Sequence, residues 1–467
     1  LAGGLILHGC NGIFDDLAIN PNQPSMGAYF TSPSAVNDAV MTMYGYMSTQ
    51  RCLGASGSKT TIIRSDEASS NSDYGKPGMF GADLNASYYT IEQPYTLMYT
   101  TASQASYIIE TAPSVDFSGN EEMRNAYMGE AYFWRAFAHY YLLINFRNIS
   151  PIRQMPRNGD DYVRPLEKPA AVWDFIQEDL AHAKELLPVK GYWDSKNAGR
   201  VTKASAAALL GKAYLYRSGI EQYYGEDKTT FYSEAAKEFG DVIDGKYGTY
   251  DLTKNYADNF DVAHENNEES ILEFQFLGDV DNAGFNPGLA TSGLAFDSRG
   301  LMLPGAGVGY EGVVHNWLYN AFVNSVDKDG YTDIRMFSTM IFNDLDASIH
   351  LRNDAGGNPV RLEGPGGYKW EELYPAKNGK EGFATVSNPL AHSFKAGIRK
   401  GIDCSMPTQT EADGTPKLVG VGAGVKEYVY NQPRAHGVNW RYIRYADVLM
   451  MYAESVVSGG TPASNMT

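Results

Sequence analysis

The chain of 467 residues lacks several features that mark specialised classes of protein. It contains only three cysteines, Cys10, Cys52 and Cys404, with neither metal-ligand spacing nor a CxxC pair. This low count excludes a small scaffold held together by many disulfides, although a Cys52–Cys404 pairing is left open. No run of about 18 apolar residues occurs, so we expect no transmembrane helix.

Positive charge is also scarce in this chain. It has 38 Lys and Arg residues against 55 Asp and Glu, which gives a formal net charge of -17. Nucleic-acid binding depends on clustered basic side chains that neutralise phosphates, so we expect no nucleic-acid partner. The same balance disfavours attachment to an anionic membrane through basic patches, and it leaves neutral and cationic ligands open.

Motifs of enzymes and cofactor sites are few. No GxSxG elbow, HExxH motif or P-loop occurs, but the many carboxylates leave a glycosidase pair open. Gly307–Gly312 spells GxGxxG, yet Pro304 precedes it instead of the strand that a dinucleotide site requires, so a loop is predicted. Asp279–Asn282 and Asp327–Gly330 lack the Glu that completes an EF-hand loop, so we favour turns over calcium sites. We therefore expect no cofactor, with a calcium site of another type left open.

Tyrosine, by contrast, is abundant, with 33 Tyr against 20 Phe and 6 Trp. A Tyr ring offers an apolar face and a polar tip, which suits a ligand that is both stacked upon and hydrogen-bonded, such as a neutral sugar. Two segments combine aromatic rings with amide and carboxylate side chains. They supply the ligand-binding candidates Asp66, Tyr74, Tyr88, Tyr89, Phe296, Tyr310, Asn316, Trp317 and Tyr319.

Trp317 is the first candidate among these residues. The competing interpretation is a core residue, because Val313, Val314, Trp317 and Leu318 also fit an amphipathic helix. Asp66 has the alternative of a capping or turn residue. For the tyrosines, the alternative is that they rim the helices of a large fold.

Apolar residues recur at helical spacing in separated blocks, most clearly from Asn125 to Phe146. Small residues between Ala206 and Ala213 indicate helices that approach closely. Paired helices of this kind predict a mainly α, tetratricopeptide-like scaffold with an inserted, loop-rich region of short strands. The other predicted helices are Val36–Met47, Tyr95–Ile109, Val172–Leu187, Lys203–Arg217 with Thr202 as N-cap, one capped by Ser233, and Trp440–Val457.

The beginning of the chain resembles the end of a signal peptide. Leu1–Leu7 is apolar, and His8 and Gly9 then precede Cys10, as in a bacterial lipobox. We expect Cys10 to be lipidated; the alternative is a buried strand with a free thiol. Since no initiating Met is present, we expect the chain to be truncated. The predicted organisation is a signal-peptide remnant (1–9), a tether (10–24), a helical scaffold (25–277), a loop-rich ligand-binding region (278–437) and a C-terminal scaffold helix (438–467).

Four blocks, in order and at matching spacing, resemble the SusD/RagB family of nutrient-binding lipoproteins. Each block alone mainly reflects helix packing, but the four together, within about residues 10–457, are specific to the family. They are Glu130–Phe137 with Leu142, Phe146 and Pro151–Ile152 after it, Trp173–Leu180 with Leu187–Pro188, Gly199–Lys203 leading to Tyr216, and Arg444–Leu449 with Tyr452–Glu454.

The resemblance implies a cell-surface lipoprotein on a Bacteroidetes-type outer membrane. It implies a partner, a SusC-like TonB-dependent transporter on which the protein sits as a lid. It also implies that Tyr95 occupies the place where many members have a ligand-binding Trp. We therefore expect a glycan-binding protein that is not an enzyme and passes oligosaccharides or polysaccharides to the transporter. The alternatives are a peptide-capturing RagB-like protein and, less favoured, an all-α glycoside hydrolase.

Overall fold

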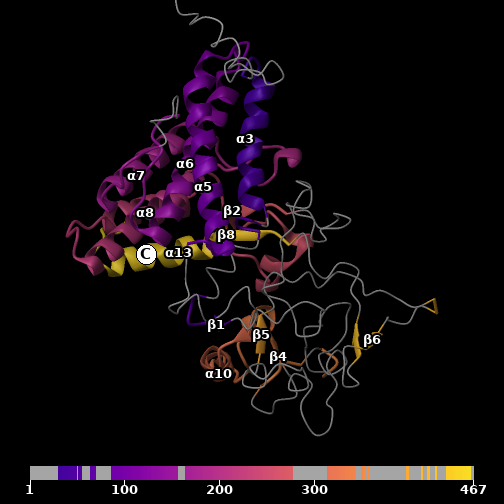
Figure 1. Cartoon of the computed structure of the whole chain (residues 1–467). Coiled ribbons are helices and arrows are strands. Elements are labelled where there is room, and N and C mark those ends of the chain that lie inside the picture. Colours follow the sequence, from indigo (N-terminus) through magenta and orange to yellow (C-terminus); the bar gives the residue numbers. More distant parts are fainter. Residues whose placement is uncertain are drawn as a thin grey trace, which may run out of the picture.

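The computed structural model contains two regions, a bundle of long helices and a smaller region of short strands and helices below it (Figure 1). Figure 1 also shows β8 and α13, the last strand and helix, crossing the base of the bundle. The structure describes residues 30–49, 51–54, 64–69, 86–155, 163–276, 313–342, 349–353, 355–357, 396–398, 412–413, 418–420, 426–428 and 438–463.

The bundle is an array in which each long helix packs mainly on the next one along the chain. Short connections join α5 to α6 and α8 to α9, as in the antiparallel helix pairs of tetratricopeptide-like folds. The predicted mainly α scaffold is thus confirmed. Its helices are α3 (Pro33–Ser48), α5 (Tyr89–Thr111), α6 (Glu121–Phe146), α7 (Pro169–Leu186), α8 (Lys203–Tyr224), α9 (Tyr232–Ile243) and α13 (Tyr445–Val457), with short 3-10 helices at Ala112–Ser114, Ser195–Asn197, Tyr256–Phe260 (η5) and Val262–His264 (η6).

Helix α6 is the centre of the bundle. It begins at the N-cap Asn120, whose Oδ1 accepts a hydrogen bond from Met123 N at 3.1 Å. Glu121 and Glu122 in its first turn complement the positive end of the helix dipole. Because both α5 and α7 pack on α6, its second half is buried around nearly its whole circumference.

Buried ion pairs connect helices that the hydrophobic core already holds together. Arg135 on α6 makes two 2.7 Å hydrogen bonds to Asp179 on α7. Glu130 on α6 accepts two from Arg200, at 2.9 and 2.6 Å, and a third from Tyr44 at 2.7 Å. Burial raises the pKa of Glu130, and the bonds from Arg200 oppose that shift. Removing one partner of such a pair would leave a buried charge, so these pairs constrain the register between helices.

Helices α8 and α9 approach closely at Gly211. A Cβ atom added there would lie 2.7 Å from the ring of Phe239 on α9. The small residues therefore have the role that the sequence predicts for them. Thr202 is the N-cap of α8, also as predicted, and the helix ends at Gly225, whose φ of 70° lies in the left-handed region.

Two sequence predictions are corrected by the structure. The helix predicted from Trp440 begins only at Tyr445, because Trp440–Arg444 forms strand β8, which pairs antiparallel with β2 (Ser270–Phe274). Helix α9 has Phe231 rather than Ser233 at its N-cap. The Ser233 hydroxyl instead accepts a hydrogen bond from Thr461 N at 3.0 Å, which joins α9 to the segment after α13.

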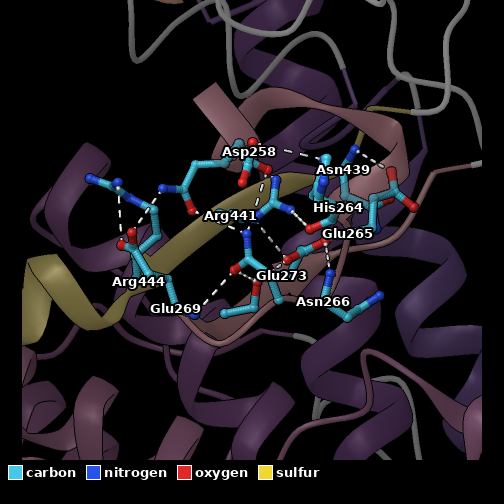
Figure 2. A network of polar contacts seen from close by, with 12 residues as sticks. Asp258, His264, Glu265, Asn266, Glu269, Glu273, Asn439, Arg441 and Arg444 are labelled. Carbon is cyan, nitrogen blue, oxygen red and sulfur yellow. Dashed lines mark hydrogen bonds and ion pairs between the residues drawn. The ribbon is translucent and has the colours of Figure 1, made fainter. Parts of the chain in front are cut away.

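Strands β2 and β8 form the base from which residues 277–437 leave the scaffold and return to it. A buried polar network locks this base (Figure 2). Arg441 on β8 lies 3.2 Å from the Glu273 carboxylate and donates hydrogen bonds to the carbonyls of Asn259 and His264. Asn439 donates to Glu273 at 2.9 Å. The network therefore fixes both strands and the η5–η6 loop as one unit.

The lower region has a small core of its own. Its four-stranded sheet has the order β1–β3–β5–β4 and is antiparallel at every pairing. Helices α10 (Asn316–Asn324) and α11 (Arg335–Thr339) belong to this region. The strands are β1 (Ala68–Ser69), β3 (Val313–Val314), β4 (Met340–Phe342) and β5 (Ala396–Ile398), and a separate hairpin pairs β6 (Leu418–Gly420) with β7 (Lys426–Tyr428).

Two further observations concern the sequence predictions about membranes and cysteines. Among the helices that the structure describes, none is long and apolar enough to cross a membrane. Cys52 is a buried free thiol, so the pairing with Cys404 that the sequence left open is not formed. Burial raises the pKa of the Cys52 thiol to about 12, which keeps it protonated and unreactive at neutral pH.

Candidate functional site

The short strand pair β1–β3 brings together the two segments that supply the sequence-predicted ligand candidates. Ala68 pairs with Val314 and Ser69 with Val313, although almost 250 residues separate the two strands. The pairing continues past the sheet, because His315 N donates to Glu67 O at 2.9 Å. The segment that contains Asp66 therefore lies directly beside the beginning of α10.

Trp317 is held at this junction in a defined orientation. Its indole Nε1–H donates a 2.7 Å hydrogen bond to the backbone carbonyl of Asp66. The side chain nevertheless remains 49% exposed. Because the polar edge of the indole is bonded to the protein, the ring is fixed while much of its surface faces solvent, which is the arrangement that stacking on a sugar requires.

The neighbours of Trp317 on α10 differ in their exposure. Asn316, the first residue of the helix, is half-buried. Tyr319 is only 2% exposed and packs in a cluster with Val314 and Met336. The Tyr319 ring therefore packs inside the lower region and supports the beginning of α10, where Trp317 lies. Asp66 contributes its carbonyl to Trp317, and its own side chain is exposed.

The second group of candidates lies around the beginning of α5. Tyr88 is half-buried and precedes the helix, and its carbonyl accepts from Ile91 N and Glu92 N in the first turn. Tyr95 is 39% exposed, with its ring centroid 4.9 Å from those of both Tyr99 and Phe146 in edge-on contacts. Tyr95 is thus an accessible ring braced by two others, as a stacking residue should be.

Several predicted residues are not covered by the structural description. Tyr89 begins α5, but its side chain is outside the described residues. Tyr74, Phe296, Tyr310, Cys10, the glycine motif at 307–312 and the segment 279–282 also lie outside them.

The turn at Asp327–Gly330 has the structural role that the sequence favours. The Asp327 carboxylate accepts hydrogen bonds from Asp329 N at 2.8 Å and Tyr331 N at 3.1 Å, and it pairs with Arg352. Gly330 closes the turn with a φ of 85°. These bonds already use the carboxylate that a calcium ion would need. Across the described ranges, no group of three or more His, Cys, Asp or Glu side chains is arranged to hold a metal.

Other exposed aromatic residues were not singled out in the sequence. Tyr223 is 84% exposed and Tyr224 58% exposed at the end of α8, where Arg147 lies 4.1 Å above the Tyr224 ring. Adjacent tyrosines at a helix end carry no distinctive sequence signal. Exposed tyrosines thus occur on more than one face, and Trp317 is distinguished from them by its hydrogen bond to a segment distant in sequence.

Comparison with known proteins agrees with this architecture. Residues 19–215 match a family model, SusD-like, described as starch-binding and associating with the outer membrane. A SusD-like protein of Bacteroides ovatus is 26% identical over 277 residues, which cover 58% of this chain and 48% of the relative. The chain therefore spans about half the length of that curated relative.

Solved structures share the fold. A SusD superfamily protein from Bacteroides vulgatus superposes with a TM-score of 0.65 at 20% identity, covering 92% of this chain and 77% of that one. A protein described as a laminarin-binding SusD-like protein gives 0.62 at 20% identity, covering 93% and 82%. The helical array, the family model over residues 19–215 and the curated relative agree with one another, so the chain is similar to SusD-like proteins in its scaffold sequence and in its fold.

Proposed function

We propose that this protein captures glycans and releases them unchanged, without catalysing a reaction. The observation that carries the proposal is the exposed indole of Trp317, oriented by its hydrogen bond to the Asp66 carbonyl. The family model describes starch binding, and one solved relative is described as binding laminarin. Both descriptions concern carbohydrates, which supports a sugar as the ligand.

The chemistry of the exposed Trp317 ring suits a neutral sugar. The C–H face of a pyranose ring is apolar and packs on an indole, while its hydroxyls need donors and acceptors at the rim of that contact. The exposed Asp66 side chain and the half-buried Asn316 adjoin Trp317. Since the Trp317 ring is already oriented, binding does not have to immobilise it, and this limits the entropic cost.

In this proposal the protein acts at the cell surface. Cys10 carries the lipid anchor, residues 10–24 form the tether, and the protein serves as the lid of a SusC-like TonB-dependent transporter. The helical scaffold of residues 25–277 and 438–467 supports the assembly, and residues 278–437 form the ligand-binding region. Moderate affinity suits such a role, because a ligand held too tightly is not passed on.

Affinity electrophoresis through gels that contain different neutral polysaccharides tests the proposal. We expect at least one polysaccharide to retard the protein, and Trp317→Ala to weaken that binding by about tenfold or more. Trp317→Phe should retain part of the binding, because it keeps an aromatic ring but loses the hydrogen bond to Asp66. Tyr223→Ala is the control, since it removes an exposed ring elsewhere.

Other outcomes would replace this function. Saturable binding of a peptide mixture, with no retardation by any polysaccharide, would identify a peptide-capturing protein. Release of shorter products from a labelled polysaccharide would identify a hydrolase. Full retardation of the Trp317→Ala variant would remove Trp317 from the site.

A further inference from the structure

A second cluster of polar groups lies in the helical scaffold, outside the lower region that contains Trp317. It consists of Lys212 and Tyr216 on α8, Tyr140 on α6 and Tyr442 on β8. The Lys212 ammonium lies 4.8 Å from the ring centroid of Tyr442 and 5.3 Å from that of Tyr216. The rings of Tyr140 and Tyr216 are 6.1 Å apart. Three elements therefore bring one cation and three phenols together.

None of these four groups has a hydrogen-bond partner within the described part of the chain. The Tyr140 hydroxyl is fully buried and makes no hydrogen bond there. The Lys212 ammonium is within 4.0 Å of no carboxylate among the described residues, and it contacts the two rings. Buried polar groups are normally hydrogen-bonded, so the buried Tyr140 hydroxyl lacks an acceptor, and the three partly exposed groups beside it have none within the described residues.

The electrostatics of the cluster favour donors over acceptors. Burial raises the pKa of Tyr140 and Tyr442, and their mutual repulsion with Tyr216 adds to the shift, so all remain protonated. Burial lowers the pKa of Lys212 to about 8, which the charge of Asp447 partly opposes. At neutral pH the cluster therefore presents an ammonium and three phenolic O–H groups, with the negative charges of Asp447 and Glu454 acting on Tyr216.

The cluster is accessible from the surface. Tyr216 is 38% exposed, and Lys212 and Tyr442 are half-buried. Trp440 is also half-buried, with its ring centroid 5.5 Å from that of Tyr442. A small charged substituent can reach the ammonium from outside while the body of its ligand lies against the aromatic rings.

We infer that Lys212, with the hydroxyls of Tyr140, Tyr216 and Tyr442, binds an anionic substituent of a glycan, either a carboxylate or a sulfate. An anion supplies the acceptors that the four donors lack, and charge-assisted bonds to it are the strongest available to the cluster. Trp440 lies where a sugar ring that bears the substituent can pack. The part of the inference that makes the ligand a glycan rests on the proposed function. The part that places an anion at this cluster does not depend on that function.

The simpler explanation is that the aromatic rings alone satisfy the cation. A cation–π contact contributes about 0.5–2 kcal/mol. A buried ion costs several kcal/mol of desolvation, of which the half-buried Lys212 ammonium bears a part, and the two rings offset some of that part. They also offer nothing to the Tyr140 hydroxyl. The explanation therefore accounts for Lys212 in part and for Tyr140 not at all.

Calorimetric titration compares an acidic oligosaccharide, tetragalacturonate, with neutral galactotetraose. We expect the protein to bind the acidic one at least tenfold more tightly, and Lys212→Met to abolish that preference. Lys212→Arg should restore part of it because the charge is kept. Lys237→Met, which removes an exposed lysine from α9, is the control and should change nothing. Equal affinity for both sugars in the unmodified protein would overturn the sugar part of the inference.

A second measurement needs no sugar. The rate at which acetic anhydride acetylates Lys212, followed by mass spectrometry over pH 6–10, reports the protonation of its amine. Sulfate at millimolar concentration should slow the acetylation of Lys212 about tenfold at pH 8. It should also raise the pH at which the rate is half-maximal, because a bound anion favours the ammonium. The charge of Asp447 acts on this amine. Around it, Glu454 and Asp447 act on Tyr216, and Tyr216 and Tyr442 act on Tyr140.

Tyr140→Phe separates a binding role from a structural one. It removes a buried hydroxyl that has no partner among the described residues, so it should stabilise the ligand-free protein or leave its stability unchanged. It should also weaken the sulfate effect. No response of Lys212 to sulfate would overturn the anion site. Protection by sulfate in a protein that binds no glycan would sustain the site and refute the proposed function instead.

Discussion

His139 shows how one buried side chain makes the stability of this scaffold depend on pH. Ile152 N donates a 2.9 Å hydrogen bond to its Nε2, which must therefore be unprotonated. Nδ1 then carries the proton and donates to Arg135 O at 2.8 Å. Burial lowers the pKa of His139 to about 3, so the imidazole is neutral in the folded protein at all ordinary pH values.

The unfolded chain binds a proton at this histidine below about pH 6.5, whereas the folded chain does not until about pH 3. Stability is therefore lost as the pH falls through this window, by about 1.4 kcal/mol per pH unit. Between pH 7 and pH 5, His139 should reduce the free energy of unfolding by about 2 kcal/mol. Urea denaturation at several pH values measures this change.

A matched pair of variants isolates the histidine from the carboxylates that also titrate. His139→Gln cannot gain a charge in this range, so its stability should decline less steeply from pH 7 to pH 5. His182 is exposed, and His182→Gln should keep the steep decline. Identical slopes for all three proteins would contradict the neutral, buried imidazole.

At the scale of elements, the beginning of α8 is joined to strand β2 by one hydroxyl. The β2–β8 register shifts between Ser270 and Leu272, which leaves Ile271 as the extra residue of a bulge. Its carbonyl accepts a 2.6 Å hydrogen bond from the buried Ser205 hydroxyl. The same hydroxyl accepts from Thr202 N at 3.1 Å. A single side chain thus caps the helix and satisfies the bulge.

Ser205→Ala should therefore cost more than the loss of an ordinary surface cap. It leaves one donor and one acceptor unpaired inside the protein, which we expect to lower the free energy of unfolding by about 2–3 kcal/mol. Ser103→Ala is the control, because the Ser103 hydroxyl only donates to Tyr99 O within α5. Chemical denaturation of both variants measures the difference, and equal losses would contradict the dual role.

The helices of the scaffold were predictable because their signals are local. Asn125–Phe146 repeats apolar residues at helical spacing, and α6 occupies that segment with one additional turn at its start. The sequence alone predicts a helix for residues 440–444 because their aromatic residues fit both the helical period of 3.6 residues and the strand period of two. Only pairing with β2, some 170 residues earlier, makes this segment a strand.

The candidate sites depend on contacts between distant segments. Trp317 could be proposed as an aromatic residue in a polar setting, but its bond to Asp66 follows from a pairing across almost 250 residues. Lys212, Tyr140 and Tyr442 come from three elements whose patterns indicate only helix packing. Sequence periodicity carries no information about which of these residues meet.

At the scale of the whole molecule, strands β2 and β8 allow the inserted region to be separated from the scaffold. Phe274 pairs with Trp440, and Phe276 N donates to Asn439 Oδ1 at 2.7 Å. The ends of the excursion over 277–437 are therefore adjacent. A short turn can connect them as a β-hairpin without moving either strand.

Replacing residues 277–437 with a four-residue Gly-Asn-rich turn should leave a folded helical protein. Shortening the loop reduces the entropic cost of closing it by about 3 kcal/mol, which favours the paired strands. We expect cooperative thermal unfolding and native helical circular dichroism, loss of binding through Trp317, and retained protection of Lys212 by sulfate. A molten, non-cooperative product would show that the scaffold requires the inserted region.

The position of α13 against α9 has a consequence for protein synthesis. Ile243 ends α9, and its packing partner begins about 200 residues later, at Tyr445. At about 5–20 residues per second, a ribosome needs about 10–40 s to translate that interval. During this time the apolar surface of α9 that α13 later covers is exposed on the nascent scaffold. A chaperone would find its binding site there at that stage.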